Sequence, residues 1–183
     1  MIDQELEKFV VESLKEDIQT GDHTSLACIN KANISNAEII AKNSGLIAGV
    51  ELAEYIFKKV DNKLDLKQHF KDGDSVKKGD VILSISGTTL SILKCERLVL
   101  NCMQQMSAIA TKTNNICKKI ANTKTKILDT RKTIPLNRKI QKWAVKIGGG
   151  INHRFSLDDM IMIKDNHIDF CGGIAQAIQT TKK

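Results

Sequence analysis

Residues 126–133 read Lys-Ile-Leu-Asp-Thr-Arg-Lys-Thr, and this stretch decides the fold class of the second half of the chain. Its apolar start predicts a strand over 126–129, and apolar spacing predicts a helix over 138–147 as the next element. The same order recurs, with a strand predicted over 160–164 and a helix over 173–181. Two strand–helix units in succession predict parallel strands covered by helices.

Charged and polar residues follow both predicted strands. Thr130, Arg131 and Lys132 follow the first strand, and Lys164 ends the second, Met160–Lys164. Functional side chains collect where parallel strands end, so these residues are candidates for one site. We expect the stem of Lys164 to be flanked by core and its ammonium to be partly desolvated. The alternatives are a solvated turn at 131–132 and a surface lysine at 164.

Two further motifs lie between these strand ends. Gly148, Gly149 and Gly150 could curve backbone amides around a phosphate, or could simply end the preceding helix. Asn152-His153-Arg154 places a titratable imidazole beside a guanidinium, which fits either a binding site or a packed loop.

The net charge of +7 is unevenly distributed. Residues 1–100 carry 16 acidic and 13 basic side chains, whereas residues 101–183 carry 5 acidic and 15 basic ones. A basic half can attract nucleic acid, an anionic membrane or small anions. Aromatic residues are only 4% of the chain, with no aromatic–basic alternation for stacking bases, so small anions are favoured. The four arginines, which can grip carboxylate or phosphate bidentately, all lie between Arg97 and Arg154.

Composition excludes several protein classes. The apolar runs are too short to span a bilayer, and the first residues do not resemble a signal peptide. Five cysteines without a C-x-x-C pair, and four histidines without zinc-like spacing, predict reduced thiols in the cytoplasm and no zinc site. A membrane protein, a secreted disulfide scaffold and a fibrous protein are therefore excluded.

The first half is predicted to mix helices and antiparallel strands. Helices are expected over 3–18, begun by Asp3, and over 51–60, with strand segments over 37–42, 64–70 and on to Ser86. Residues 89–121 lack Pro and Gly and show helical spacing. This span is too long for one ordinary helix, so we expect a break near Ser107 that separates two domains, 1–106 and 107–183.

A binding module is the alternative from another functional class. Residues 72–81 resemble a biotinyl or lipoyl hairpin, but no modifiable lysine stands at a suitable hairpin tip, so this repeat is interpreted as structural.

Taken together, the motifs resemble one enzyme family. They are Glu16-Asp17-Ile18 with Gly21–Ser25, Cys95–Asn101, Leu128–Thr133, Gly148–Gly150 with Asn152–Phe155, and Ile163–Ile168. In this order and spacing they are similar to quinolinate phosphoribosyltransferases, over essentially the whole chain. Residues 134–138 depart from the family's usual Thr-Pro-Gly-Leu-Arg, because they read Ile-Pro-Leu-Asn-Arg.

The resemblance implies transfer of a phosphoribosyl group from phosphoribosyl pyrophosphate, with Mg²⁺, to quinolinate, giving nicotinate mononucleotide, CO₂ and pyrophosphate in NAD biosynthesis. It implies a cationic cradle for quinolinate, with Thr130 as a further substrate-binding residue. It also implies an arginine that reaches into the site of a neighbouring subunit, and therefore at least a dimer. The cradle residues would be Arg131, Lys132, His153, Arg154 and Lys164, and the reaching arginine would be Arg97. No catalytic acid or base and no metal ligand is assigned, and neither nucleic acid nor membrane is expected as a partner.

The resemblance also implies the fold. It is an α/β protein with an N-terminal α+β sandwich domain over 1–106, followed over 107–183 by the first two βα units of an open α/β barrel. A full barrel takes roughly 250 residues, so the barrel is expected to be incomplete, with the magnesium ligands beyond Lys183. The alternatives are a related phosphoribosyltransferase with another substrate and a truncated, non-catalytic binding or assembly remnant.

Overall fold

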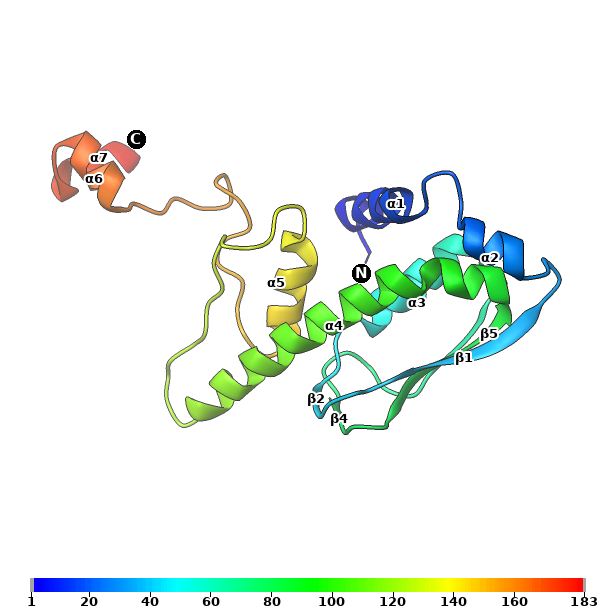
Figure 1. The fold of residues 1–183 in the computed structure, drawn as a ribbon. Coiled ribbons are helices and arrows are strands. Elements are labelled where there is room, and N and C mark those ends of the chain that lie inside the picture. The colour runs from blue at the N-terminus through cyan, green and yellow to red at the C-terminus, as the bar shows by residue number, and fades with distance from the viewer. Residues whose placement is uncertain (1, 183) are drawn as a thin grey trace.

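The computed structural model describes residues 2–182, as a small sheet domain with helices and a long helix that leads to a helical second half (Figure 1). The helices are α1 Gln4–Ile18, α2 His23–Cys28, α3 Val50–Val60, α4 Thr89–Lys119, α5 Arg138–Ile147, α6 Asp165–Cys171 and α7 Ile174–Thr181. The strands are β1 Ile34–Ile40, β2 Gly45–Leu46, β3 Asp65–Gln68, β4 Ser75–Val76 and β5 Val81–Thr88.

The first half is the predicted mixture of helices and antiparallel strands. Strand β5 lies between β1 and β3, and β2 pairs with β4, all antiparallel. Asp3 begins α1 as expected, because its side chain accepts a hydrogen bond from the Leu6 amide at 3.0 Å. Helix α2 was missed, although Asp22 caps it in the same way through the Ser25 amide.

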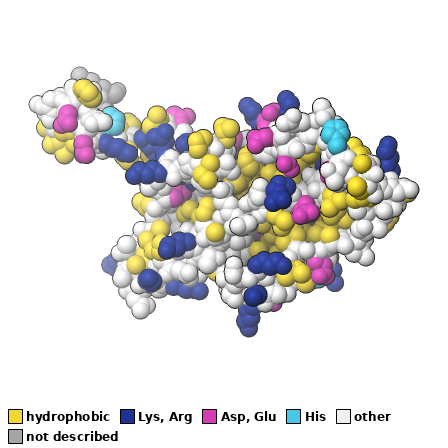
Figure 2. Space-filling view, viewed as in Figure 1, with side chains coloured by type: hydrophobic (Ala, Val, Ile, Leu, Met, Phe, Trp, Pro, Cys, Tyr) yellow, Lys and Arg dark blue, Asp and Glu magenta, His cyan; other side chains and the backbone are white. Residues whose placement is uncertain are grey.

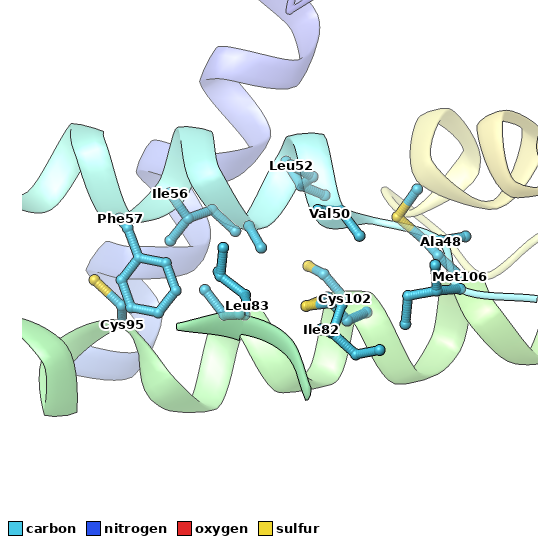
Figure 3. Packing of buried hydrophobic residues seen from close by; sticks show 14 of the residues in the cluster. Ala48, Val50, Leu52, Ile56, Phe57, Ile82, Leu83, Cys95, Cys102 and Met106 are labelled. Carbon is cyan, nitrogen blue, oxygen red and sulfur yellow. The ribbon is translucent and has the colours of Figure 1, made fainter. Parts of the chain in front are cut away.

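The core lies where α3 and α4 pack against the sheet. Figure 3 shows Leu52, Ile56 and Phe57 of α3 facing Cys95 and Cys102 of α4, with the side chains of Ile82 and Leu83 from β5 beside them. Strand β5 contributes the buried side chains of Ile82, Leu83 and Ile85. Strand β1 alternates half-buried and exposed positions, which is the pattern of a sheet covered on one face. The first half is therefore a two-layer α/β sandwich.

The predicted break near Ser107 is wrong. Helix α4 is one uninterrupted helix of 31 residues, whose buried stripe runs from Ile92 to Thr113. It begins beside α2 and extends past α5 (Figure 1), so it has packing partners along most of its length. Helix length is limited by the burial available to its apolar stripe, and here both halves of the chain supply that burial.

Ser107 lies inside α4, and its hydroxyl bonds to a segment outside the helix. The hydroxyl accepts from the Ala48 amide at 3.0 Å and donates to the Ala48 carbonyl at 3.1 Å. One turn later, Thr111 bonds both backbone groups of Leu46, at 2.9 and 3.3 Å. These two hydroxyls hold the segment 46–48 against the helix.

The second half differs from the predicted pair of βα units. Helices α5 and α7 form where they were expected, but the segment 126–129 makes only one parallel bridge, Leu128 with Ile151. The predicted strand Met160–Lys164 is absent, because no described segment forms a ladder with it and a strand requires a hydrogen-bonded neighbour. Helices α6 and α7 pack on each other and stand apart from the remaining elements in Figure 1.

Candidate functional site

Two extended segments lie side by side and carry most of the candidate cations at their carboxyl ends. The Ile151 amide donates to the Ile127 carbonyl at 2.9 Å, and the Asp129 amide donates to the Ile151 carbonyl at 3.1 Å. Thr130, Arg131 and Lys132 follow the first segment, and His153 and Arg154 follow the second. The structure thus brings these five predicted residues to one edge, although the neighbour of 126–129 is Ile151 rather than the predicted strand over 160–164.

Residues 130–132 form an exposed turn. The Thr130 hydroxyl accepts a hydrogen bond from the Lys132 amide at 3.1 Å, which shapes the turn. The side chains of Arg131 and Lys132 are exposed and so accessible to a dissolved anion. Figure 2 shows dark-blue Lys and Arg side chains grouped on this side of the body, near its connection to α6 and α7.

His153 and Arg154 are less accessible than the cations of the turn. His153 is half-buried, whereas Arg154 is only 7% exposed. One Arg154 nitrogen, Nη1, donates to the Met160 carbonyl, and its buried Nε has no partner among the described residues. A buried guanidinium N–H without an acceptor is costly, and its positive charge favours an anion nearby.

The region also contains a buried ion pair that the sequence interpretation missed. Lys142 of α5, whose side chain is 1% exposed, donates to Oδ1 of Asp129, which is 8% exposed. Oδ1 also accepts from the His153 amide at 2.7 Å. With its nitrogen turned toward Asp129, the Asn152 amide donates to Oδ2 at 2.7 Å and to the Lys142 carbonyl at 2.9 Å.

One sequence signal did point to this pair. Asp129 is the only acidic residue between Glu96 and Asp158, in the most basic part of the chain. A lone acid among bases suggests a specific cationic partner, but spacing alone does not select Lys142 among the neighbouring lysines.

Arg138, one of the four arginines of the basic half, connects the two cation-bearing segments. Its Nε donates to the Thr133 hydroxyl at 3.1 Å, and its Nη1 donates to the Phe155 carbonyl at 2.9 Å. These two nitrogens of Arg138 therefore hydrogen-bond to oxygens of the protein and fix the start of α5.

The three glycines end α5 and allow close packing. The Gly150 amide bonds the Val145 carbonyl at 2.9 Å and the Gly149 amide bonds the Lys146 carbonyl at 3.0 Å, with Gly149 at φ +92°. This is the hydrogen-bond pattern of a Schellman C-cap. Of the two interpretations of this motif, the structure shows the helix end.

Lys164 and Arg97 lie away from the other candidates. Lys164 is exposed at the start of α6 rather than flanked by core, because the apolar run before it does not enter a sheet. Arg97 is exposed on α4 and borders a cleft of about 590 Å³ between α1, α4 and the start of α5. Polar side chains line much of this cleft, among them Asp17, Asn101, Gln105 and Asn137.

Among residues 2–182, no three His, Cys, Asp or Glu side chains gather as metal ligands. Within the same range, none of the helices combines the length and apolar character needed to cross a bilayer.

Two family models match consecutive parts of the chain. The model described as quinolinate phosphoribosyl transferase, N-terminal domain, matches residues 22–107, and that of the C-terminal domain matches residues 109–183. The point between the two matches lies inside α4.

Curated proteins and solved structures agree with these models. A Bacillus subtilis protein named probable nicotinate-nucleotide pyrophosphorylase (carboxylating) is 42% identical, over 98% of this chain and 62% of its own length. A chloroplastic Arabidopsis thaliana protein of the same activity name is 47% identical, over 92% and 48%. The crystal structure of NadC from Streptococcus pyogenes is 35% identical with a TM-score of 0.94, covering 100% of this chain and 65% of that one. The chain thus spans about half to two thirds of these relatives.

Proposed function

This chain belongs to the quinolinate phosphoribosyltransferase family, and on that premise we propose that it serves phosphoribosyl transfer to quinolinate in NAD biosynthesis. The reaction joins quinolinate and phosphoribosyl pyrophosphate and yields nicotinate mononucleotide, pyrophosphate and CO₂. The observation that carries the proposal is the cationic edge formed by 130–132 and 153–154, since quinolinate is a dicarboxylate.

The proposed roles follow from the position of each cation. Exposed Arg131 and Lys132 attract the two carboxylates, and the buried guanidinium of Arg154 adds positive charge beside them. Fixing the carboxylates aims the ring nitrogen at the ribose carbon that loses pyrophosphate. Orientation and preorganised positive charge are the contributions of these residues, and both are large terms in catalysis.

The bond changes balance without an enzymic base. The nitrogen lone pair forms the bond to the ribose carbon, and the departing pyrophosphate keeps the electrons of its C–O bond. The carboxylate next to the now cationic nitrogen leaves as CO₂, and its bonding pair stays on the ring carbon. That carbon then takes a proton from solvent. No cluster among residues 2–182 fits Mg²⁺, and the ion is proposed to arrive bound to phosphoribosyl pyrophosphate.

Two copies of the chain are proposed to act together. Arg97 is exposed on the α1–α2 side of α4, where it borders clefts that contain none of the residues of the cationic edge, so it is positioned to serve a second copy. Cytoplasmic residence is proposed from the odd number of cysteines without a C-x-x-C pair.

Quinolinate-dependent release of CO₂ in the presence of phosphoribosyl pyrophosphate and Mg²⁺ tests the function. We expect Arg131→Ala to weaken quinolinate binding about 10-fold or more, the loss of a charge-assisted bond, with Lys126→Ala as the control. Release from another pyridine acid but not from quinolinate would favour a related enzyme with a different substrate. Unchanged turnover in Arg131→Ala would refute the cradle.

A further inference from the structure

The buried pair Asp129–Lys142 joins three separate parts of the candidate site. Asp129 ends the first extended segment, Lys142 lies on α5, and His153 begins the cationic part of the second segment. The carboxylate of Asp129 accepts from both of the others, so one side chain sets the spacing between the segments.

The surroundings of Lys142 leave it little freedom to do anything else. Its ammonium lies 5.4 Å from the centre of the Phe155 ring, and its side chain is 1% exposed. Its own carbonyl accepts from the Asn152 amide at 2.9 Å, which ties the backbone of α5 to the residue before His153. A lysine buried to this degree is maintained only with a partner charge.

We propose that Lys142 and Asp129 are positioning residues for the anion-binding edge, an inference that rests on the proposed function. Asp129 holds the loops that carry Arg131 and Arg154, and Lys142 neutralises Asp129. Without that neutralisation, a buried negative charge would lie directly beside residues that must attract a dicarboxylate. The pair therefore fixes the two loops without placing an unneutralised negative charge beside the anionic ligand.

This proposal predicts an asymmetry that a purely structural pair would not show. Lys142→Met leaves an uncompensated anion at the site, whereas Asp129→Asn leaves an uncompensated cation. Both variants break the same pair, yet Lys142→Met should weaken quinolinate binding more, and added salt should reduce the difference. A structural pair predicts that affinity follows the loss of stability, whichever partner is changed.

The test is calorimetric titration of the 183-residue chain with quinolinate, together with amide hydrogen exchange. The double variant Lys142→Met with Asp129→Leu removes both charges, which usually preserves folding where the volumes are similar. We expect the double variant to fold and its amide hydrogens to exchange faster only at 129–133 and 151–155. We also expect it to bind quinolinate at least about 10-fold more weakly, which is the usual effect of losing a residue that orients a ligand-binding group. Lys146→Met, exposed one turn further along α5, is the matched control and should behave as wild type.

The outcomes separate this inference from the proposed function. If the wild-type chain does not bind quinolinate, the proposed function fails, while the exchange data still decide whether the pair orders the two loops. If the double variant folds and binds within about twofold of wild type, or if its loops exchange as before, the positioning role is refuted. If the double variant does not fold, the two single variants decide. Weaker quinolinate binding by Lys142→Met than by Asp129→Asn supports the positioning role, and equal or reversed affinities refute it.

Discussion

Gly148 lies directly against Ala110 of α4: a side-chain β-carbon at position 148 would come within 2.5 Å of the Ala110 carbonyl oxygen. The same added β-carbon would lie 2.7 Å from the β-carbon of Thr113, one turn further along α4. The end of α5 therefore reaches α4 by backbone contact, and α4 connects this contact to the sheet domain.

Gly148→Ala should destabilise the protein through this contact. Gly148 has an ordinary φ of −73°, so the cost arises from overpacking alone, about 1–3 kcal/mol. Urea unfolding measures it, and Lys146→Ala on the exposed face of α5 should change stability by less than about 0.5 kcal/mol. A fully stable Gly148→Ala protein would show that α5 does not pack on α4 as described.

Thr111→Val should detach the segment 46–48 from α4. The variant keeps the shape of the side chain but leaves the amide and carbonyl of Leu46 without their partner, a loss of about 1–3 kcal/mol. Thr111→Ser retains the hydroxyl and should retain most of the stability. Equal unfolding midpoints for the Val and Ser variants would contradict the role of the hydroxyl.

Leu136→Gly should stabilise the turn between residues 130–132 and α5. Leu136 has φ +63° and is 92% exposed, so its side chain strains the backbone without burying surface in return. Relief of the strain, less the entropy glycine adds to the unfolded chain, predicts a gain of about 0.5 kcal/mol. Leu136→Ala keeps the β-carbon and should give no gain, which makes it the control. The family's usual glycine at this position has the same physical explanation.

The buried and the exposed cysteines should differ in their reactivity toward alkylating reagents. Burial raises the pKa of Cys95 and of Cys102 to about 12, so neither forms the reactive thiolate at neutral pH. Cys28 and Cys171 are exposed. Alkylation followed by peptide mass analysis should label Cys28 and Cys171 first and reach Cys95 and Cys102 only after unfolding. Rapid labelling of Cys102 in the native protein would show that the α3–α4 core is open.

The contact between α1 and α5 should weaken in acid. Lys139 lies 2.5 Å from Asp3, and this hydrogen bond is the main cause that lowers the pKa of Asp3 below its usual 3.8. A lowered folded-state pKa means that the stabilisation is present above 3.8 and is lost as the pH falls through the folded-state value. Thermal unfolding should therefore separate wild type from Lys139→Met at neutral pH and bring them together in acid. A difference that persists in acid would show that Asp3 is not responsible.

Much of the first half could be predicted because its patterns are local. Asp3 at the start of α1, the helix expected over 51–60 and the alternating strand expected over 64–70 depend on neighbours within a few residues. The length of α4 could not be predicted in this way. The span 89–121 is longer than an ordinary helix, but partners from both halves of the chain bury its apolar stripe, and Ser107 in its middle bonds to Ala48, 59 residues away.

The candidate site was predicted in its residue types and only partly in its arrangement. The sequence alone determined the family motifs and the candidate residues Thr130–Lys132, His153 and Arg154, because short polar and charged runs after apolar segments can be recognised locally. Only the tertiary structure decided which segments lie together: Ile151 beside Ile127, and Lys164 apart from both. It also revealed Lys142, since burial of one lysine among many depends on the packing of α5 against two distant segments, which no local pattern encodes.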